Sequence, residues 1–278
     1  MKEVYEFRLF EREAQEHLAA DVGIRHGLAR VVVTSRGDQV FRAVGNAQRK
    51  LIRRGDRLIA SWNVRRTYTS PELARAEAFR LLVTSTFEPS GEECGTEFDD
   101  SLSCDICGVG RLQTSVLRLE GSRIPRTDFS NTIAREVIVT SGTASKLEAL
   151  GASGVDFGAI QSCGGASVQL DDWRQVRVTG PTVRVASRTK WGHTPFDAEP
   201  AGSEICARGH VRGVNVLSEV FLDRSTWTGA DFAVTQEHEG IPMGLIRPWP
   251  IVIISRRAWL WLREIAATGW AAEIAHIS

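Results

Sequence analysis

Three of the five cysteines in this chain of 278 residues fall close together, at Cys94, Cys104 and Cys107. Cys104 and Cys107 form a C-x-x-C-G motif, in which a tight turn directs two thiolates at one metal ion. Gly108 relieves crowding where backbone amides approach the sulfurs. Structural zinc takes four ligands in a tetrahedron. The segment therefore predicts three ligands of a zinc site, and the fourth must come from a distant part of the chain.

Other uses of these cysteines are less consistent with the sequence. A redox pair of the thioredoxin kind opens a helix after a strand, whereas Gly108 and Gly110 would break a helix here. Reduced thiols without a metal are the second alternative, because one C-x-x-C motif is only moderately specific. Cys163 lies apart from the cysteine motifs, and we expect it to be an ordinary small buried residue.

An internal repeat organises the second half of the chain. Asp128–Thr132 recurs as Asp231–Thr235, and Val137–Ser141 recurs as Val252–Ser255. In each copy the serine is followed by a helix-like segment, a glycine that ends the helix and a short strand. The sequence therefore predicts two copies of a strand-helix-strand module.

The repeat also relates two cysteine segments. Cys104 lies 24 residues before the first Asp-Phe pair, and Cys206 lies 25 residues before the second. A C-x-x-x-H segment that ends at His210 thus stands where the first copy has C-x-x-C, and two such half-sites can share one ion. His210 is an alternative ligand that could take the place of Cys94 or of Cys206. The predicted ligands of one structural zinc per chain are Cys94, Cys104, Cys107 and Cys206.

The predicted fold class is α+β, with a β-rich N-terminal part plus two copies of the strand-helix-strand module around a zinc knuckle. In the N-terminal part we expect short strands and turns, followed by a helix that begins at Ser70 and buries Leu73, Ala76 and Phe79. The expected domains are a β-rich N-terminal region at 1–90, a first cysteine-containing module at 91–165, a β connector at 166–204 and a second module at 205–278.

The composition is that of an ordinary globular protein, with 42% hydrophobic and 24% charged residues. The N-terminus has no apolar leader, and no uncharged apolar run approaches the length of a membrane span. We therefore expect a cytoplasmic protein without membrane contact. An odd number of cysteines in a reducing compartment favours metal binding or free thiols over a disulfide framework.

The overall formal charge of zero conceals a basic segment and an acidic one. Residues 25–66 contain ten Arg and one Lys against two Asp, whereas residues 92–105 contain six acidic side chains and no basic one. Such a basic segment could follow a phosphate backbone. Its basic residues are spread across predicted strands, which favours a solvated face that pairs with acidic groups over a nucleic-acid site.

Two pairs of side chains could in principle perform acid-base chemistry. His193 with Asp197 would be a base and its orienting partner, and Asp99 with Asp100 would be paired carboxylates. Neither pair lies beside a nucleophile elbow or an H-E-x-x-H motif. The structural interpretation is therefore preferred for both pairs, and no catalytic residue is predicted.

Several segments together resemble a known group of bacterial proteins. The resemblance is to an uncharacterised bacterial family with ECGT, CxxCG and CxxGH motifs and, more distantly, to the double-CXXCG immunity proteins, which are encoded beside secreted toxins. It covers about residues 60 to 278. Its motifs are Glu93-Cys94-Gly95-Thr96, Cys104-x-x-Cys107-Gly108, Cys206-x-x-Gly209-His210 and Gly244-Leu245-Ile246-Arg247-Pro248.

The sequence departs from the double-CXXCG pattern at two places. Gly91 stands where the first cysteine of an initial motif would lie, and His210 follows Cys206 in place of a second CxxCG. These departures leave at most one zinc ion, not two. The resemblance implies a non-enzymatic, zinc-stabilised protein that binds and neutralises a cognate bacterial toxin. The alternative is a zinc-containing nucleic-acid-binding protein that uses the basic segment 25–66, and an enzyme is the third choice.

Overall fold

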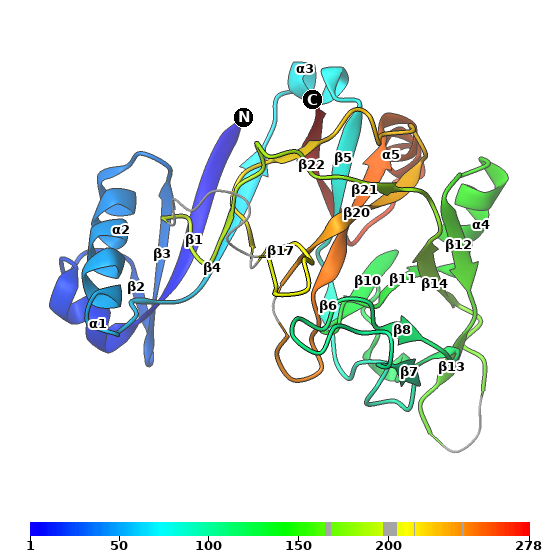
Figure 1. Ribbon diagram of the computed structural model, residues 1–278, viewed down its shortest axis with the longest axis horizontal. Helices are drawn as coiled ribbons and strands as arrows, with labels where there is room; N and C mark the ends of the chain where they lie inside the picture. The colour runs from blue at the N-terminus through cyan, green and yellow to red at the C-terminus, as the bar shows by residue number, and fades with distance from the viewer. Residues whose placement is uncertain (165–167, 197–204, 214, 241) are drawn as a thin grey trace. The chain divides into compact units, whose positions relative to one another are not determined.

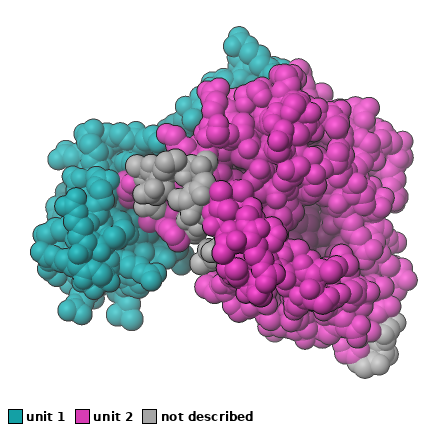
Figure 2. All heavy atoms as spheres, viewed as in Figure 1, with its two compact units in different colours: residues 1–75 teal, residues 76–278 magenta. Residues whose placement is uncertain are grey.

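The computed structural model describes the chain except for residues 165–167, 197–204, 214 and 241 (Figure 1). Five α-helices and 22 mostly short strands occur among the described residues, so the predicted α+β class is confirmed. The chain divides into two compact units, Met1–Arg75 and Ala76–Ser278 (Figure 2). The division falls before β5 (Ala78–Val83), which belongs to a sheet of the second unit, whereas the sequence predicts a first boundary near residue 90.

The first unit is a four-stranded antiparallel sheet with two helices on one face. Its strand order is β2-β3-β1-β4, the split βαβ arrangement of ferredoxin-like folds. Tyr5 and Phe7 point to the covered face of β1, and their rings lie 4.9 Å and 6.0 Å from the ring of Phe41 on α2. The elements are β1 (Lys2–Phe10), α1 (Glu11–His17), β2 (Ile24–His26), β3 (Ala29–Ser35), α2 (Gln39–Ile52), β4 (Ile59–Thr67) and α3 (Ser70–Arg75).

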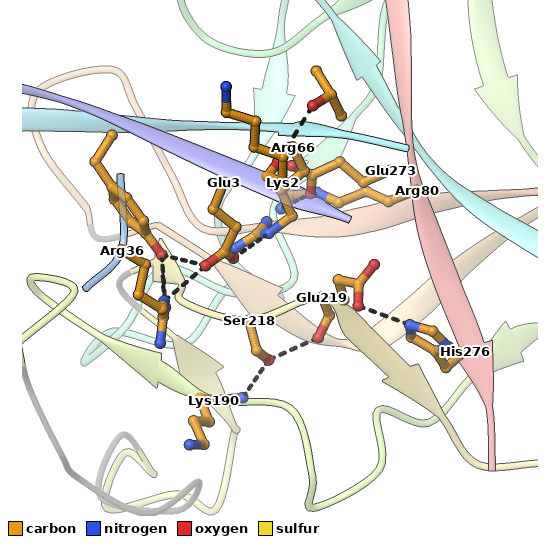
Figure 3. Close-up of polar contacts among 12 residues, drawn as sticks. Lys2, Glu3, Arg36, Arg66, Arg80, Lys190, Ser218, Glu219, Glu273 and His276 are labelled. Carbon is orange, nitrogen blue, oxygen red and sulfur yellow. Dashed lines mark hydrogen bonds and ion pairs between the residues drawn. The ribbon is translucent and has the colours of Figure 1, made fainter. Parts of the chain in front are cut away.

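Two carboxylates, Glu11 and Glu3, stabilise this sheet. Glu11 receives two hydrogen bonds from Arg30, at 3.0 Å and 2.8 Å, and the hydrogen bonds from that guanidinium lower the pKa of Glu11. Glu3 on β1 accepts hydrogen bonds from Tyr5 and from Arg66 of β4 (Figure 3). The charged groups therefore tie together elements that are far apart in the chain.

Helices contribute more to the first unit than the sequence predicts. Helix α2 has 14 residues and buries Phe41, Val44 and Leu51, where we expected short strands and turns. Conversely, α3 ends at Arg75, and Phe79 is a buried residue of β5 instead of the last member of a helical stripe. The predicted helix start at Ser70 is confirmed, but its length is wrong.

The second unit contains a five-stranded and a seven-stranded sheet. The first has the order β12-β14-β11-β10-β6, and the second has β15-β20-β21-β5-β22-β19 with β17 beside β20. The elements of the first sheet and its helix are β6 (Thr86–Phe87), β10 (Phe129–Thr132), β11 (Val137–Thr140), α4 (Ser141–Ala149), β12 (Val155–Gly158) and β14 (Trp173–Val178). Those of the second, besides β5, are β15 (Thr182–Val183), β17 (Arg212–Gly213), β19 (Val220–Leu222), β20 (Phe232–Glu239), β21 (Trp249–Ser255), α5 (Arg256–Glu264) and β22 (Trp270–Ile277).

The two sheets share one order of pairings. Each strand of the order β12-β14-β11-β10-β6 has a counterpart in β22-β5-β21-β20-β15 of the second sheet. The correspondence includes the parallel pairs, β10 with β6 and β20 with β15. In each sheet a strand, a helix and a strand follow one another in the chain, as β11-α4-β12 and β21-α5-β22. Along the chain the second unit has two halves, from β5 to β13 and from β14 to β22. Strand β5 belongs to the first half but lies in the second sheet, and β14 belongs to the second half but lies in the first sheet. Each half therefore contributes one strand to the sheet of the other half.

Two aspartates join the halves in the same reciprocal way. Asp128 accepts hydrogen bonds of 2.8 Å from the backbone N–H and hydroxyl of Thr268, in the turn after α5. Asp231 accepts the matching pair from Ser153, at 2.9 Å each, in the turn after α4. The aspartate of each half thus holds the turn that follows the helix of the other half.

The remaining elements are short and lie in the connections. They include two short antiparallel pairs, β7 with β8 and β16 with β18, and the parallel pair β13 with β9. Their bounds are β7 (Phe98–Asp99), β8 (Leu112–Gln113), β9 (Leu117–Leu119), η1 (Gly121–Arg123), β13 (Ile160–Ser162), β16 (Trp191–Gly192) and β18 (Asn215–Val216).

Candidate metal centre

Four side chains from two distant segments meet in the second unit. One ligand atom each from Cys104, Cys107, Cys206 and His210 lies within 4.8 Å of all the others. The sulfurs of Cys104 and Cys206 are 4.0 Å apart, and His210 Nδ1 lies 3.6 Å from the sulfurs of both Cys107 and Cys206. A tetrahedral ion with bonds of about 2.3 Å to sulfur and about 2.0 Å to nitrogen requires edges of about 3.8 Å and about 3.6 Å. The four atoms therefore fit a tetrahedral metal ion.

Each half-site is a tight turn closed by backbone hydrogen bonds. In the first turn Gly108 N–H donates to Cys104 O at 2.7 Å, and in the second Gly209 N–H donates to Cys206 O at 2.8 Å. Both glycines have left-handed backbones, with φ of 70° and 83°, which a side chain would strain. The sequence C-x-x-C-G and the sequence C-x-x-G-H therefore build two similar turns whose side chains meet in one group that could hold an ion.

Burial and hydrogen bonding shift the thiol pKa values of Cys104 and Cys107 in opposite directions. The three cysteines are buried, whereas His210 is exposed at the rim of the site. Burial alone would raise the pKa of Cys104, but hydrogen bonds from the backbone of Cys107 and Ile106 lower it to about 6. Burial raises the pKa of Cys107 to about 11. A bound cation would favour the thiolate of every cysteine in the group.

The predicted ligand Cys94 lies outside the metal group. Its turn is closed by hydrogen bonds from Cys94 N–H to Ser90 O and from Thr96 N–H to Gly91 O. Burial, followed by a contact with Cys163, raises the pKa of Cys94 to about 12. Among the four predicted ligands, Cys104, Cys107 and Cys206 come together, and His210 occupies the place we gave to Cys94. Cys163 is exposed, so the expectation of a buried residue is wrong.

The candidate acid-base pairs form no reactive site among the described residues. His193 is exposed, and its proposed partner Asp197 lies outside the described residues. Asp99 accepts a hydrogen bond of 2.7 Å from the backbone N–H of Ser101, and such bonds lower its pKa. Asp100 pairs with Arg111 at 3.0 Å instead of sharing a proton with Asp99.

The chain matches no model of a protein family, and no curated protein matches it. Within the part of the chain that the structure describes, no helix is long and apolar enough to cross a membrane.

Proposed function

We propose that this protein is a non-enzymatic, zinc-stabilised immunity-type protein that binds and neutralises a cognate bacterial toxin in the cytoplasm. The observation that carries the proposal is the closed set of three cysteines and one histidine, Cys104, Cys107, Cys206 and His210. A tetrahedral ion held by these four ligands has no position left for water or substrate, in contrast to catalytic zinc, which keeps one position open. The toxin as partner is inferred from the resemblance of the cysteine motifs to immunity proteins.

Zinc is the ion that the ligand chemistry favours. Three sulfurs and one imidazole suit zinc, whereas magnesium and calcium prefer oxygen ligands. The two turns that supply the ligands lie in the two cysteine-containing modules, so the ion would join duplicated strand-helix-strand modules at a shared knuckle. Elemental analysis of the purified protein should give about one zinc per chain, and a value near zero would remove the site.

The immunity function is tested by the product of a neighbouring gene. We expect a toxin encoded beside this protein to stop growth when expressed alone and to be harmless when both proteins are expressed. The two purified proteins should then form a stable complex. A neighbouring gene product that is harmless alone, or a toxin that kills despite the presence of this protein, would contradict the proposal.

One surface of the first unit favours nucleic-acid binding as the second candidate function. Basic residues gather on one side of α2 and on the loop after it, where the sequence predicted that they were spread across strands. All of them are exposed, and of their side chains only that of Arg49 makes a hydrogen bond among the described residues. This basic stripe comprises Arg42, Arg49, Lys50, Arg53, Arg54 and Arg57.

The open face of the same sheet limits which nucleic acids fit. Its central strands present Glu6, Arg8 and Val33, and the exposed Phe10 at the end of β1 offers a ring on which a base could stack. Contacts to phosphates by the basic stripe would still dominate. With about five phosphate contacts, the logarithm of the affinity for duplex DNA should fall with the logarithm of salt concentration with a slope of about −4 to −5. A flat salt dependence would exclude this function.

A further inference from the structure

A cavity of about 400 Å³ separates the two sheets of the second unit. It opens where β21 leaves β5, since the ladder between them ends at the pair Ile253 and Arg80. Beyond that pair β21 follows β20, while β5 follows β22. Strands β10, β11 and β14 of the first sheet complete the wall, so all six strands are matched pairs from the two halves.

The walls of this cavity are mainly apolar. Valines from both sheets line it, and each is only half-buried although it lies within a strand. Apolar side chains on facing sheets normally fill the space between them. Here they leave apolar surface accessible to the body of a ligand, and the volume lies in the range of small-molecule sites. The valines are Val83, Val137, Val176, Val178, Val234 and Val252.

One end of the cavity carries an arginine without an anionic partner. The Arg135 guanidinium lies 4.4 Å from the centre of the Trp249 ring. It forms no hydrogen bond or ion pair in the described part of the chain. Burial lowers its pKa, the nearby charge of Glu239 partly offsets that effect, and the charge of Arg80 adds to it. Arg135 lines the cavity and is exposed, so its five N–H donors lie at the cavity rim, open to solvent and to a ligand.

The neighbouring carboxylates are already engaged. Glu239 accepts from Arg80 at 2.6 Å through one oxygen and from Trp249 Nε1 at 3.0 Å through the other. Arg80 also lies 3.6 Å from Glu273 (Figure 3). Glu136 lines the same end, and its carboxylate accepts hydrogen bonds from Gly91 N–H and the Thr132 hydroxyl. Arg135 is thus the cation that this end leaves available to an anion.

The backbone at Arg135 supports a role for its side chain. Its φ is 69°, in the left-handed region that favours glycine. The turn from β10 to β11 is closed by Arg135 N–H donating to Thr132 O at 2.9 Å, a bond that any residue could form. The turn therefore does not require an arginine, and strained positions of this kind cluster at binding sites.

We propose that this cavity binds a small organic acid with an apolar body. The carboxylate of the ligand pairs with the Arg135 guanidinium, and the apolar body lies against the valines of both sheets. The planar guanidinium suits a carboxylate because it can donate two parallel hydrogen bonds to it. The proposal is independent of zinc and of the toxin, because no metal ligand lines the cavity.

Octanoate is a suitable probe, with octanol as its uncharged counterpart, and isothermal titration calorimetry of the zinc-loaded full chain is the assay. We expect saturable binding of one octanoate and at least tenfold weaker binding of octanol. Arg135→Gln should weaken octanoate binding at least tenfold, and Val234→Trp should abolish it by filling the cavity. Arg263→Gln is the matched control, because Arg263 also stacks on a tryptophan, at 4.8 Å from the Trp259 ring, but away from the cavity.

The variants must first show the thermal unfolding transition of the parent protein. Failure of octanoate to saturate the parent protein would overturn the proposal, as would unchanged affinity in folded Arg135→Gln. Equal affinity for octanoate and octanol would overturn the role of Arg135. If only the Arg263→Gln control lost binding, the site would lie elsewhere and the proposal would also fail.

Discussion

The choice between His210 and Cys94 as metal ligand can be decided by two substitutions. His210→Ala removes the nitrogen that lies 3.6 Å from two of the three sulfurs, whereas Cys94→Ser changes a residue outside the group. Structural zinc sites in small peptides bind with about 10–16 kcal/mol. A quarter of that is about 2.5–4 kcal/mol, so His210→Ala should weaken zinc binding roughly 100-fold to 1,000-fold.

Competition with a chromogenic chelator measures this change directly. Cys94→Ser should keep the zinc affinity of the parent protein and lower the free energy of unfolding by about 1–2 kcal/mol, because a hydroxyl replaces a buried thiol. Metal content before competition should be one zinc per chain for the parent protein and for Cys94→Ser. If Cys94→Ser releases the metal while His210→Ala retains it, Cys94 and not His210 is the ligand.

Three further predictions concern the joint between the halves and the ion itself. Burial alone would raise the pKa of Asp231, but hydrogen bonds from Arg257 and Ser153 lower it to about 2. This carboxylate should stabilise the fold by about 2 kcal/mol above pH 4. That contribution should be lost as the pH falls toward 2, and Asp231→Asn should remove this part of the acid dependence in urea titrations. Gly154→Ala should lower the free energy of unfolding by about 3 kcal/mol or more, because its Cβ would lie 2.2 Å from a carbonyl oxygen. The control Gly151→Ala should lower it by only about 1 kcal/mol, because Gly151 has a left-handed φ of 73° but open space around it. Cys104→Ser should lower the melting temperature more than Cys163→Ser, since only the first removes a metal ligand, and equal shifts in calorimetry would contradict the assignment.

Sequence patterns predicted the elements of the second unit better than their pairing. The recurrence of an aspartate, a phenylalanine and a β-rich run correctly placed the strand, helix and strand of each half. The exchange of β5 and β14 was not predictable in this way. Strand β5 pairs with β22, nearly two hundred residues further along the chain, and alternation of buried residues looks the same whichever sheet a strand joins.

The errors in the first unit have a local cause. Helix α2 contains Gly45 and Asn46, which have low helix propensity, and it follows a Gly37-Asp38 turn. Its buried residues Phe41, Val44 and Leu51 nevertheless follow the helical period and face the sheet. Tertiary packing thus overrides weak propensity, and the same error hid the basic stripe, because its residues share a side only on a helix.

The ligand set was partly predictable for a similar reason. Cys104, Cys107 and Cys206 follow from the repeat, and the C-x-x-x-H spacing was the signal for His210. Cys94 looked like a ligand because it is close in sequence. Nearness in sequence does not determine where a side chain points, and the closed turn around Cys94 places its sulfur beside Cys163.

The interlocked sheets define what a metal ion can contribute to this fold. Strands β5 and β14 are exchanged between the halves, and Asp128 and Asp231 hold turns of the opposite half. The halves therefore cannot separate without breaking both sheets, whether or not an ion is bound. Binding of zinc to the native state would add its free energy to the whole unit, because the unfolded chain lacks the assembled site. A chelator should thus lower the melting temperature of the second unit as one transition, and two transitions after zinc removal would show that the ion, not the exchanged strands, couples the halves.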